Sequence, residues 1–365
     1  MMMTRREAVK ALAGGIAFCG CPSRIAAHPG KRPVRIRGRT IKTIDVHAHC
    51  FVPDAVALLD DQRRAPLLAP GFSTTREDRL LQAESANVER RLSLMDAQAI
   101  DMEVLSITPF WYGDPRDASA AIVRLQNERL AELCASHPGR FAAFATVSLQ
   151  YPDLAVTELE HAVRSLGLRG AAIGAHVNGI DFSDRRFHPV WAKAEELGAV
   201  LLIHPTEFGI ADFDKRLAGN GVLANTVGNP LSTTIALQHL IFEGTLDRFP
   251  GLKLLAVHGG GYLPSYAARS DHICRVAAGS CNDSIRLEKK PSEYLKQIYY
   301  DSLVFTAEGL RHLVAEVGAG QVMLGTDAPY PWESHPVDHV MNTPGLSDSE
   351  RMAILGGNAA RLLGL

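Results

Sequence analysis

The chain has 365 residues, of which 46% are hydrophobic and 21% are charged, the composition of a globular protein with a large buried core. Its 38 Lys and Arg residues nearly balance 40 Asp and Glu residues, and the resulting net charge of −2 does not favour nucleic acid as a partner. No apolar run approaches the roughly 20 residues that a membrane-spanning helix requires, so a polytopic membrane protein is excluded.

The first 30 residues have the order of charged and apolar regions that is typical of an export signal. Arg5 and Arg6 precede an apolar, glycine-containing stretch at residues 11–18. The paired arginines resemble a twin-arginine signal, although Ala8 stands where that signal usually has Phe. We therefore expect residues 1–30 to be a signal segment and the protein to be periplasmic. The alternative is a short basic amphipathic helix on a cytoplasmic protein.

From residue 43 onward, β-rich apolar runs alternate with segments of helical period, which is the pattern of a parallel sheet covered by helices. The apolar runs predict strands at residues 43–50, 102–109, 141–148, 171–177, 199–205, 253–259, 297–304 and 322–329. The periodic segments predict helices at residues 88–98, 118–136, 154–166, 189–197, 230–246, 263–276, 307–317 and 350–363.

This alternation indicates an α/β protein with a (β/α)8 TIM barrel rather than a doubly wound sheet, because such barrels commonly run from about 200 to over 400 residues. We expect one barrel domain at residues 40–365, because no repeat, charge block or linker divides it. The stretch 51–87 after the first strand is too long for a tight turn, and it predicts an insertion over the active-site face.

Histidines and one aspartate stand at the carboxyl ends of four predicted strands. His47 and His49 end the first strand, and they share one face because strand side chains alternate. His204 ends the fifth strand, His258 the sixth and Asp327 the eighth. Because barrel active sites lie at the carboxyl ends of the strands, we expect these side chains to converge there. Imidazole nitrogens and a carboxylate oxygen at such a place favour a metal site over a hydrogen-bonded core cluster.

This order of residues resembles the amidohydrolase superfamily, and within it the branch of 2-amino-3-carboxymuconate-6-semialdehyde decarboxylase and related nonoxidative decarboxylases. The resemblance covers nearly all of residues 43–365. Its supporting strings are LMDAQ at 94–98, HGGG at 258–261, PSEY at 291–294, MLGTD at 323–327 and PYP at 329–331.

The resemblance implies that His47, His49, His204 and Asp327 bind one divalent metal and that His258 is the acid–base residue. Zinc is expected, with manganese as the alternative, and imidazole and carboxylate ligands suit zinc. Amidohydrolases with two metals usually bridge them through a modified lysine on the fourth strand. The predicted fourth strand here contains no lysine, so the resemblance implies a single ion.

Four further residues are candidates for contact with the substrate. His176 ends the fourth strand, but such a residue equally often caps a loop. Trp111 follows the second strand and could form an apolar wall, with ordinary loop packing as the alternative. Arg76 and Arg79 lie in the predicted insertion, where a guanidinium could hold a substrate carboxylate or form a surface ion pair.

Two reactions fit this site. The resemblance favours nonoxidative decarboxylation of an unsaturated or aromatic carboxylic acid, in which His258, Asp327 or metal-bound water protonates the carbon that loses CO2. The alternative is hydrolysis of a C–C, ester or lactone bond by metal-bound hydroxide. A barrel that binds metal without turnover would leave His258 without a role. The expected partners are a small-molecule carboxylate substrate and, because barrels of this branch often dimerise, a second copy of the chain.

Overall fold

The structure is a computed structural model that describes residues 32–58, 85–107, 112–205, 215–217, 222–277, 286–330 and 332–365. Met1–Gly30 and Lys31–Leu365 are separate compact units, and the described residues all belong to the second. The predicted signal segment, Arg76, Arg79 and Trp111 lie outside the described residues.

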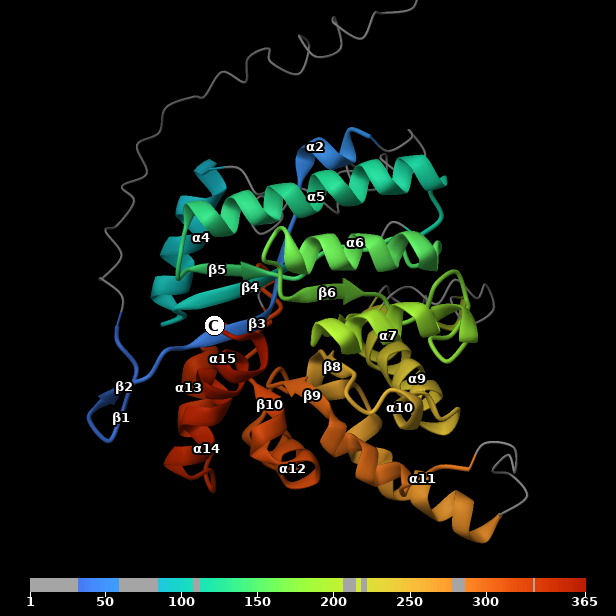
Figure 1. Ribbon diagram of the computed structural model, residues 1–365. Helices are drawn as coiled ribbons and strands as arrows, with labels where there is room; N and C mark the ends of the chain where they lie inside the picture. The colour runs from blue at the N-terminus through green and yellow to red at the C-terminus, as the bar shows by residue number, and fades with distance from the viewer. Residues whose placement is uncertain are drawn as a thin grey trace, which may run out of the picture. The chain divides into compact units, whose positions relative to one another are not determined.

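Eight parallel strands in the described part of the second unit form its centre, in two groups (Figure 1). The first group pairs in the order β3 (Ile44–Cys50), β4 (Met102–Ile107) and β5 (Phe141–Ala143). The second pairs in the order β6 (Gly170–Ile173), β7 (Val200–Ile203), β8 (Lys253–Ala256), β9 (Ile298–Asp301) and β10 (Val322–Met323).

Backbone hydrogen bonds join the two groups of strands at both edges. Beside β5 and β6, Ala145 N donates to Gly170 O at 2.8 Å. Beside β3 and the chain that follows β10, Asp327 N donates to His47 O at 2.8 Å. The eight predicted strands therefore surround a common centre, and the predicted (β/α)8 barrel is confirmed.

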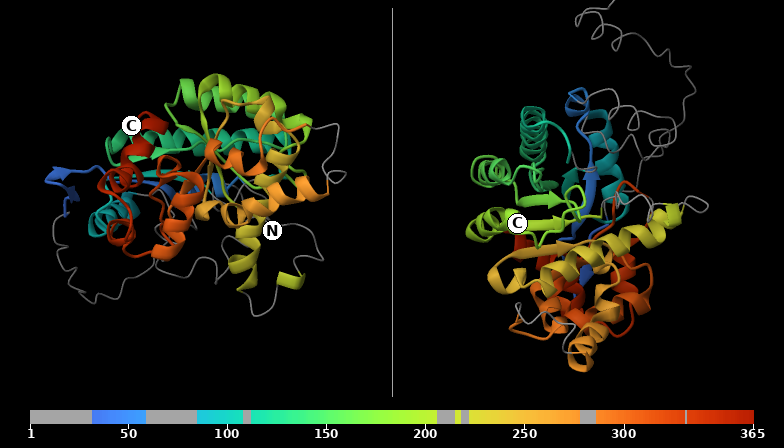
Figure 2. Two further views of the ribbon diagram at one scale, coloured as in Figure 1. Left: turned by 90° about the horizontal axis from the view of Figure 1, so that it is seen from below. Right: turned by 90° about the vertical axis from the view of Figure 1, so that its right-hand side faces the viewer.

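Helices follow the strands along the chain and lie outside them (Figure 2). Their apolar residues recur at helical spacing on the face turned to the strands, as with buried Ala155, Leu159 and Ala162. The helices are α4 (Ser85–Ala97), α5 (Arg116–Ser136), α6 (Pro152–Arg164), α7 (His188–Leu197), α9 (Asn229–Phe242), α10 (Thr245–Arg248), α11 (Leu263–Val276), α12 (Ala307–Val317), α13 (Pro336–Asn342), α14 (Asp348–Met352) and α15 (Asn358–Leu363).

Some elements differ from the sequence-based prediction. The predicted helix 230–246 is interrupted at Gly244, whose φ of +72° is left-handed and ends α9 before α10 begins. The predicted helix 350–363 contains a π-helical turn, Ala353–Gly357, between α14 and α15. Helix α13, the four-residue helix α2 (Pro53–Val56) and the β1–β2 hairpin were not predicted, because each is too short for a measurable period.

The β1–β2 hairpin, Arg35–Ile36 and Arg39–Thr40, precedes the first barrel strand. Its turn carries Arg37, whose Nε lies 2.5 Å from Asp348 Oδ2 at the start of α14. Side chains from the two ends of the described unit therefore contact each other. Among the described residues, no helix combines the length and apolar character needed to cross a membrane.

Alternate strand residues fill the barrel interior. Ile44, Val46, Val104, Leu202 and Leu255 belong to one buried apolar cluster of such positions. Above them β3 has a register shift between residues 45 and 48, which is a β-bulge or similar irregularity. Bulges of this kind re-aim side chains next to active sites.

Candidate metal centre

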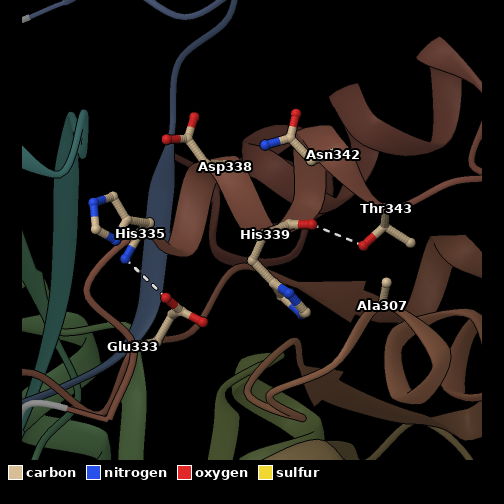
Figure 3. A pocket seen from close by; sticks show the side chains of 7 residues that line it. All are labelled: Ala307, Glu333, His335, Asp338, His339, Asn342 and Thr343. Carbon is tan, nitrogen blue, oxygen red and sulfur yellow. Dashed lines mark hydrogen bonds between the residues drawn. The ribbon is translucent and has the colours of Figure 1, made fainter.

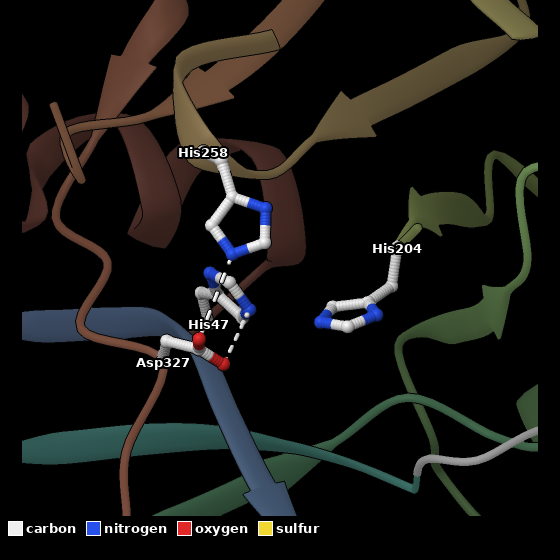
Figure 4. A group of neighbouring side chains, drawn as sticks. All are labelled: His47, His204, His258 and Asp327. Carbon is white, nitrogen blue, oxygen red and sulfur yellow. Dashed lines mark ion pairs between the residues drawn. The ribbon is translucent and has the colours of Figure 1, made fainter. Parts of the chain in front are cut away.

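The five predicted site residues come together at the carboxyl ends of the barrel strands. His47 and His49 lie on β3, His204 directly follows β7, His258 lies in a short turn after β8, and Asp327 follows β10. Figure 4 shows four of them facing one another, and the ligand atoms of His47, His204, His258 and Asp327 all lie within 4.8 Å of one another.

The Asp327 carboxylate lies at the centre of this group. Its Oδ1 is 2.7 Å from His49 Nε2 and 3.2 Å from His47 Nε2. Its Oδ2 is 3.6 Å from Nε2 of His258. The His204 ring completes the group, with its centroid 4.7 Å from that of His49. Four imidazoles thus gather around one carboxylate. The compact set of ligand atoms is that of His47, His204, His258 and Asp327, and imidazoles with a carboxylate fit one divalent metal.

The second ring nitrogen of three histidines has a partner. His47 Nδ1 lies 2.7 Å from Asp301 Oδ2, and His204 Nδ1 lies 3.0 Å from its neighbour's carbonyl, Pro205 O. Both partners only accept, so these Nδ1 atoms carry a proton, and Nε2 offers its lone pair to a metal when the ring is neutral. His49 Nδ1 lies 3.0 Å from Ser106 Oγ.

His258 differs from these three histidines. Its buried Nδ1 has no hydrogen-bond partner among the described residues. Its backbone φ of +54° is left-handed, and it opens a turn in which Gly259, Gly260 and Gly261 also have positive φ. A Cβ on these glycines would stand 2.5 Å from a Val304 side-chain carbon, 2.6 Å from a Tyr300 ring carbon and 2.2 Å from Pro230 O, respectively. Only glycine fits at each of the three positions.

Buried polar groups hold the backbone behind His47, His49 and Asp327. Asp45 accepts from His47 N at 2.9 Å and from Thr326 Oγ1 at 2.5 Å. Arg91 Nη1 donates to His49 O at 2.7 Å, and its Nε donates to Glu103. Burial and the nearby Glu103 charge raise the pKa of Asp45 to about 8.

The ionisation of the group follows from burial and mutual charge. Burial alone would lower the pKa of His47, but the Asp327 charge and the hydrogen bond to Asp301 outweigh it and raise the pKa to about 10. Burial lowers the pKa of His49 and holds the pKa of His204 well below its ordinary value. Burial opposes ionisation of Asp327, yet the His47 charge and three histidine contacts hold its pKa well below the ordinary value. Asp327 is therefore an anion that a bound cation would neutralise.

The predicted substrate residues are placed only in part. His176 Nδ1 accepts a hydrogen bond from Gly179 N at 3.1 Å, the loop-capping contact that was the alternative to substrate binding. Tyr330 was quoted only within the PYP string and was given no role in the site, and its ring centroid lies 6.1 Å from that of His49. A separate cavity of about 290 Å³ contains none of the metal-group residues (Figure 3). Its lining comprises Ala307, Glu333, His335, Asp338, His339, Asn342 and Thr343.

Sequence reasoning also missed the partners of the ligands. The contact between Asp301 and His47 was not anticipated from the sequence. Ser106 and Asp45 were not singled out. The available signal was a polar residue within a largely apolar strand, and all three side chains are fully buried in the structure.

Comparison with known proteins identifies the family. The amidohydrolase family model matches residues 44–365. The 2-amino-3-carboxymuconate-6-semialdehyde decarboxylase of Dictyostelium discoideum is 32% identical over 279 residues, which are 75% of this chain and 76% of that protein.

Two solved structures are also similar to this chain. The 5-carboxyvanillate decarboxylase of Sphingomonas paucimobilis is 26% identical with a TM-score of 0.78, and the match covers 89% of this chain and 100% of that one. A dihydroxybenzoic acid decarboxylase of Polaromonas sp. JS666, solved with manganese and 2-nitroresorcinol, is 25% identical with a TM-score of 0.72, over 89% and 98% of the chains. The resemblance to amidohydrolase-type decarboxylases that the sequence predicted is confirmed. The chain belongs to the amidohydrolase family.

Proposed function

We propose that this protein is a metal-dependent decarboxylase of a small aromatic or unsaturated carboxylic acid. The observation that carries the proposal is the placement of the Asp327 carboxylate, with metal-type ligands on one oxygen and His258 on the other. Three similar proteins, from Dictyostelium, Sphingomonas and Polaromonas, are decarboxylases of acids in these two classes, which favours decarboxylation over hydrolysis.

We assign the metal to His47, His49, His204 and Asp327. Metal-ligating histidines almost always bond their other ring nitrogen to a neighbouring group, which fixes the tautomer. The three assigned histidines each have such a partner. His258 belongs to the compact cluster of ligand atoms, but its Nδ1 lacks a partner in the described part of the chain. That ring suits proton transfer better than permanent ligation.

Zinc is the proposed metal, with manganese as the alternative. A set of three imidazoles and one carboxylate is within the range of ligands that zinc takes. The manganese in the Polaromonas structure supports the alternative. Metal analysis of protein purified without added metal, followed by reactivation of the apoprotein with each ion, decides between the two.

The residues of the chain suggest how the reaction proceeds. When bound, a divalent metal would supply Lewis acidity toward a carboxylate or adjacent oxygen of the substrate. His258 then donates a proton to the carbon that bears the carboxylate. The C–H bond forms, the C–CO2 bond breaks with its electron pair passing to the substrate framework, and CO2 leaves as that framework is restored. The buried position of His47 and His49 keeps water from that side of the group.

The test is product analysis with carboxylated aromatic acids and the metal-loaded full-length protein. Loss of CO2 from the substrate, read as a mass decrease, is expected. A mass increase by one water would instead show hydrolysis, and no change across aromatic and unsaturated acids would contradict the proposal. The His258→Asn variant is the matched control, because it retains the four assigned metal ligands.

A further inference from the structure

The Asp301 carboxylate contacts both the His47 side chain and the backbone next to His258. Asp301 is fully buried at the end of β9. Its Oδ2 lies 2.7 Å from His47 Nδ1, on β3. Its Oδ1 accepts from the backbone N of Gly259 at 2.8 Å and from that of Leu303 at 3.2 Å. Gly259 directly follows His258, so one side chain links a proposed ligand to the proposed acid–base residue.

We propose that Asp301 is a positioning residue that sets the tautomer of His47 for metal binding and holds the turn that presents His258. The inference rests on the metal assignment above. It adds a role for a residue that contacts neither the substrate nor the ligand atoms of the group.

The first part of the role follows from hydrogen-bond chemistry. Three N–H groups point at the two oxygens of Asp301, so the side chain acts as an acceptor throughout. A neutral His47 facing an acceptor must carry its proton on Nδ1, which leaves the Nε2 lone pair free for a cation. Such outer partners typically change metal affinity about 10–100-fold when they are removed.

The second part follows from the backbone of the His258 turn. His258, Gly259 and Gly260 have φ values of +54°, +61° and +77°, so three consecutive residues are left-handed. Asp301 accepts a hydrogen bond from the backbone N–H of Gly259, the central residue of the three, and so fixes the orientation of that peptide group. The surroundings are also shaped for this carboxylate, because a Cβ on Gly325 would stand 2.5 Å from Asp301 Cβ and 3.1 Å from its Oδ2.

Asp301→Asn tests the tautomer directly. The amide keeps the shape of the side chain but exchanges one acceptor oxygen for an NH2 donor. The backbone N–H groups of Gly259 and Leu303 cannot change roles, whereas His47 can move its proton to Nε2. We therefore expect the NH2 group to face His47, whose Nε2 then loses its free lone pair.

The measurement is the Kd of the purified apoprotein for Mn²⁺, by calorimetry, with the Tm of each metal-free variant. Asp301→Asn should weaken Mn²⁺ binding about 10–100-fold. Turnover at saturating Mn²⁺ should largely return, because the His258 turn keeps its acceptor. Asp301→Ala removes the contact with His47 and the contacts with the backbone at Gly259 and Leu303. It should therefore lower both Mn²⁺ affinity and kcat at saturating metal.

Two controls separate positioning from general stability. Asn358 is buried, and its Nδ2 donates to Val322 O at 2.7 Å, so Asn358→Ala should lower the apoprotein Tm and leave the Kd unchanged. Gly325→Ala keeps both Asp301 and His47 but presses on the carboxylate, so it should weaken Mn²⁺ binding even if Asp301→Asn does not fold.

Unchanged Mn²⁺ affinity in the folded Asp301 and Gly325 variants, with loss of binding in His204→Ala, would overturn this inference alone. Unchanged affinity in His204→Ala would instead overturn the metal assignment of the proposed function.

Discussion

The hydroxyl of Thr326 donates to Asp45 at 2.5 Å and thereby ties the first barrel strand to the chain after the last one. Thr326 directly precedes Asp327, and Asp45 also accepts from His47 N at 2.9 Å. Both contacts are buried. The Asp45 carboxylate therefore sets the distance between two proposed metal ligands, His47 on the first barrel strand and Asp327 after the last one.

Replacing Thr326 by Val keeps the side-chain shape but removes the donor to Asp45. A buried acceptor left without its partner typically costs about 1–3 kcal/mol, so the apoprotein should lose free energy of unfolding by that amount. Urea unfolding of the metal-free protein measures it. The control is Thr157→Val, because Thr157 is an exposed residue of α6 whose hydroxyl, among the described residues, bonds Leu154 O in its own helix. Equal, small losses of unfolding free energy in both variants would show that the hydrogen bond between Thr326 and Asp45 is unimportant.

Replacing His258 by Asn separates the acid–base residue from the metal ligands. The other four side chains still complete the metal group, so metal content should stay near that of the unaltered protein. Turnover should fall by about 10²–10⁴, the usual contribution of a positioned acid or base. His204→Ala should lose metal and activity together. If His258→Asn loses metal as severely as His204→Ala, His258 is a ligand, as its place in the compact cluster allows.

Glu158 on α6 gives the protein a pH-dependent stability away from the metal group. Burial raises its pKa to about 7, although its carboxylate accepts from the backbone N and the hydroxyl of Ser148. Because the folded state holds this proton more tightly, the contribution of Glu158 is fully present below about pH 4.5 and is lost as the pH rises through about 7.

The test is Glu158→Gln, because the amide oxygen can accept from Ser148 N and its NH2 can donate to the hydroxyl. The free energy of unfolding should decline less between pH 5 and pH 8 in this variant than in the unaltered protein. Glu160→Gln, on a half-buried neighbour in the same helix that pairs with Arg164, is the matched control. Parallel pH profiles for Glu158→Gln and the unaltered protein would refute the assignment.

The amino-terminal segment is tested by fusing residues 1–29 to a folded reporter. The paired Arg5 and Arg6 before an apolar stretch predict delivery to the periplasm by a route that depends on both arginines. Cell fractionation of the fusion, with and without Lys at both positions, measures this. A reporter retained in the cytoplasm, or exported equally well with the two lysines, would identify the segment as an ordinary extension.

Strand alternation predicted that His47 and His49 share a face, but it did not predict how that face becomes the interior. Val46 belongs to the interior core, so strict alternation would turn His47 outward. The register shift between residues 45 and 48 brings both histidines inward as well. Such a shift depends on pairing with a neighbouring strand, and a single sequence does not contain that information.

The partners of the ligands were beyond sequence reasoning for a similar reason. Asp301 and His47 are 254 positions apart, and only ring closure of the strands brings them together. The meeting of the histidines and Asp327 could be predicted because every barrel strand delivers its carboxyl end to the same face. Thus the common geometry of the fold identified the metal group, whereas each supporting contact depends on one particular side-chain pairing.

The three glycines after His258 limit how this active site could be redesigned. A side chain at 259, 260 or 261 would meet Val304, Tyr300 or Pro230, so the proposed acid–base group cannot be moved forward along the turn. A designer who wants a different proton donor must change the chemistry at position 258 itself, within a left-handed backbone that Asn and Asp tolerate better than most residues. New reactions on this barrel are therefore more accessible through the loops that face the substrate than through relocation of its proton donor.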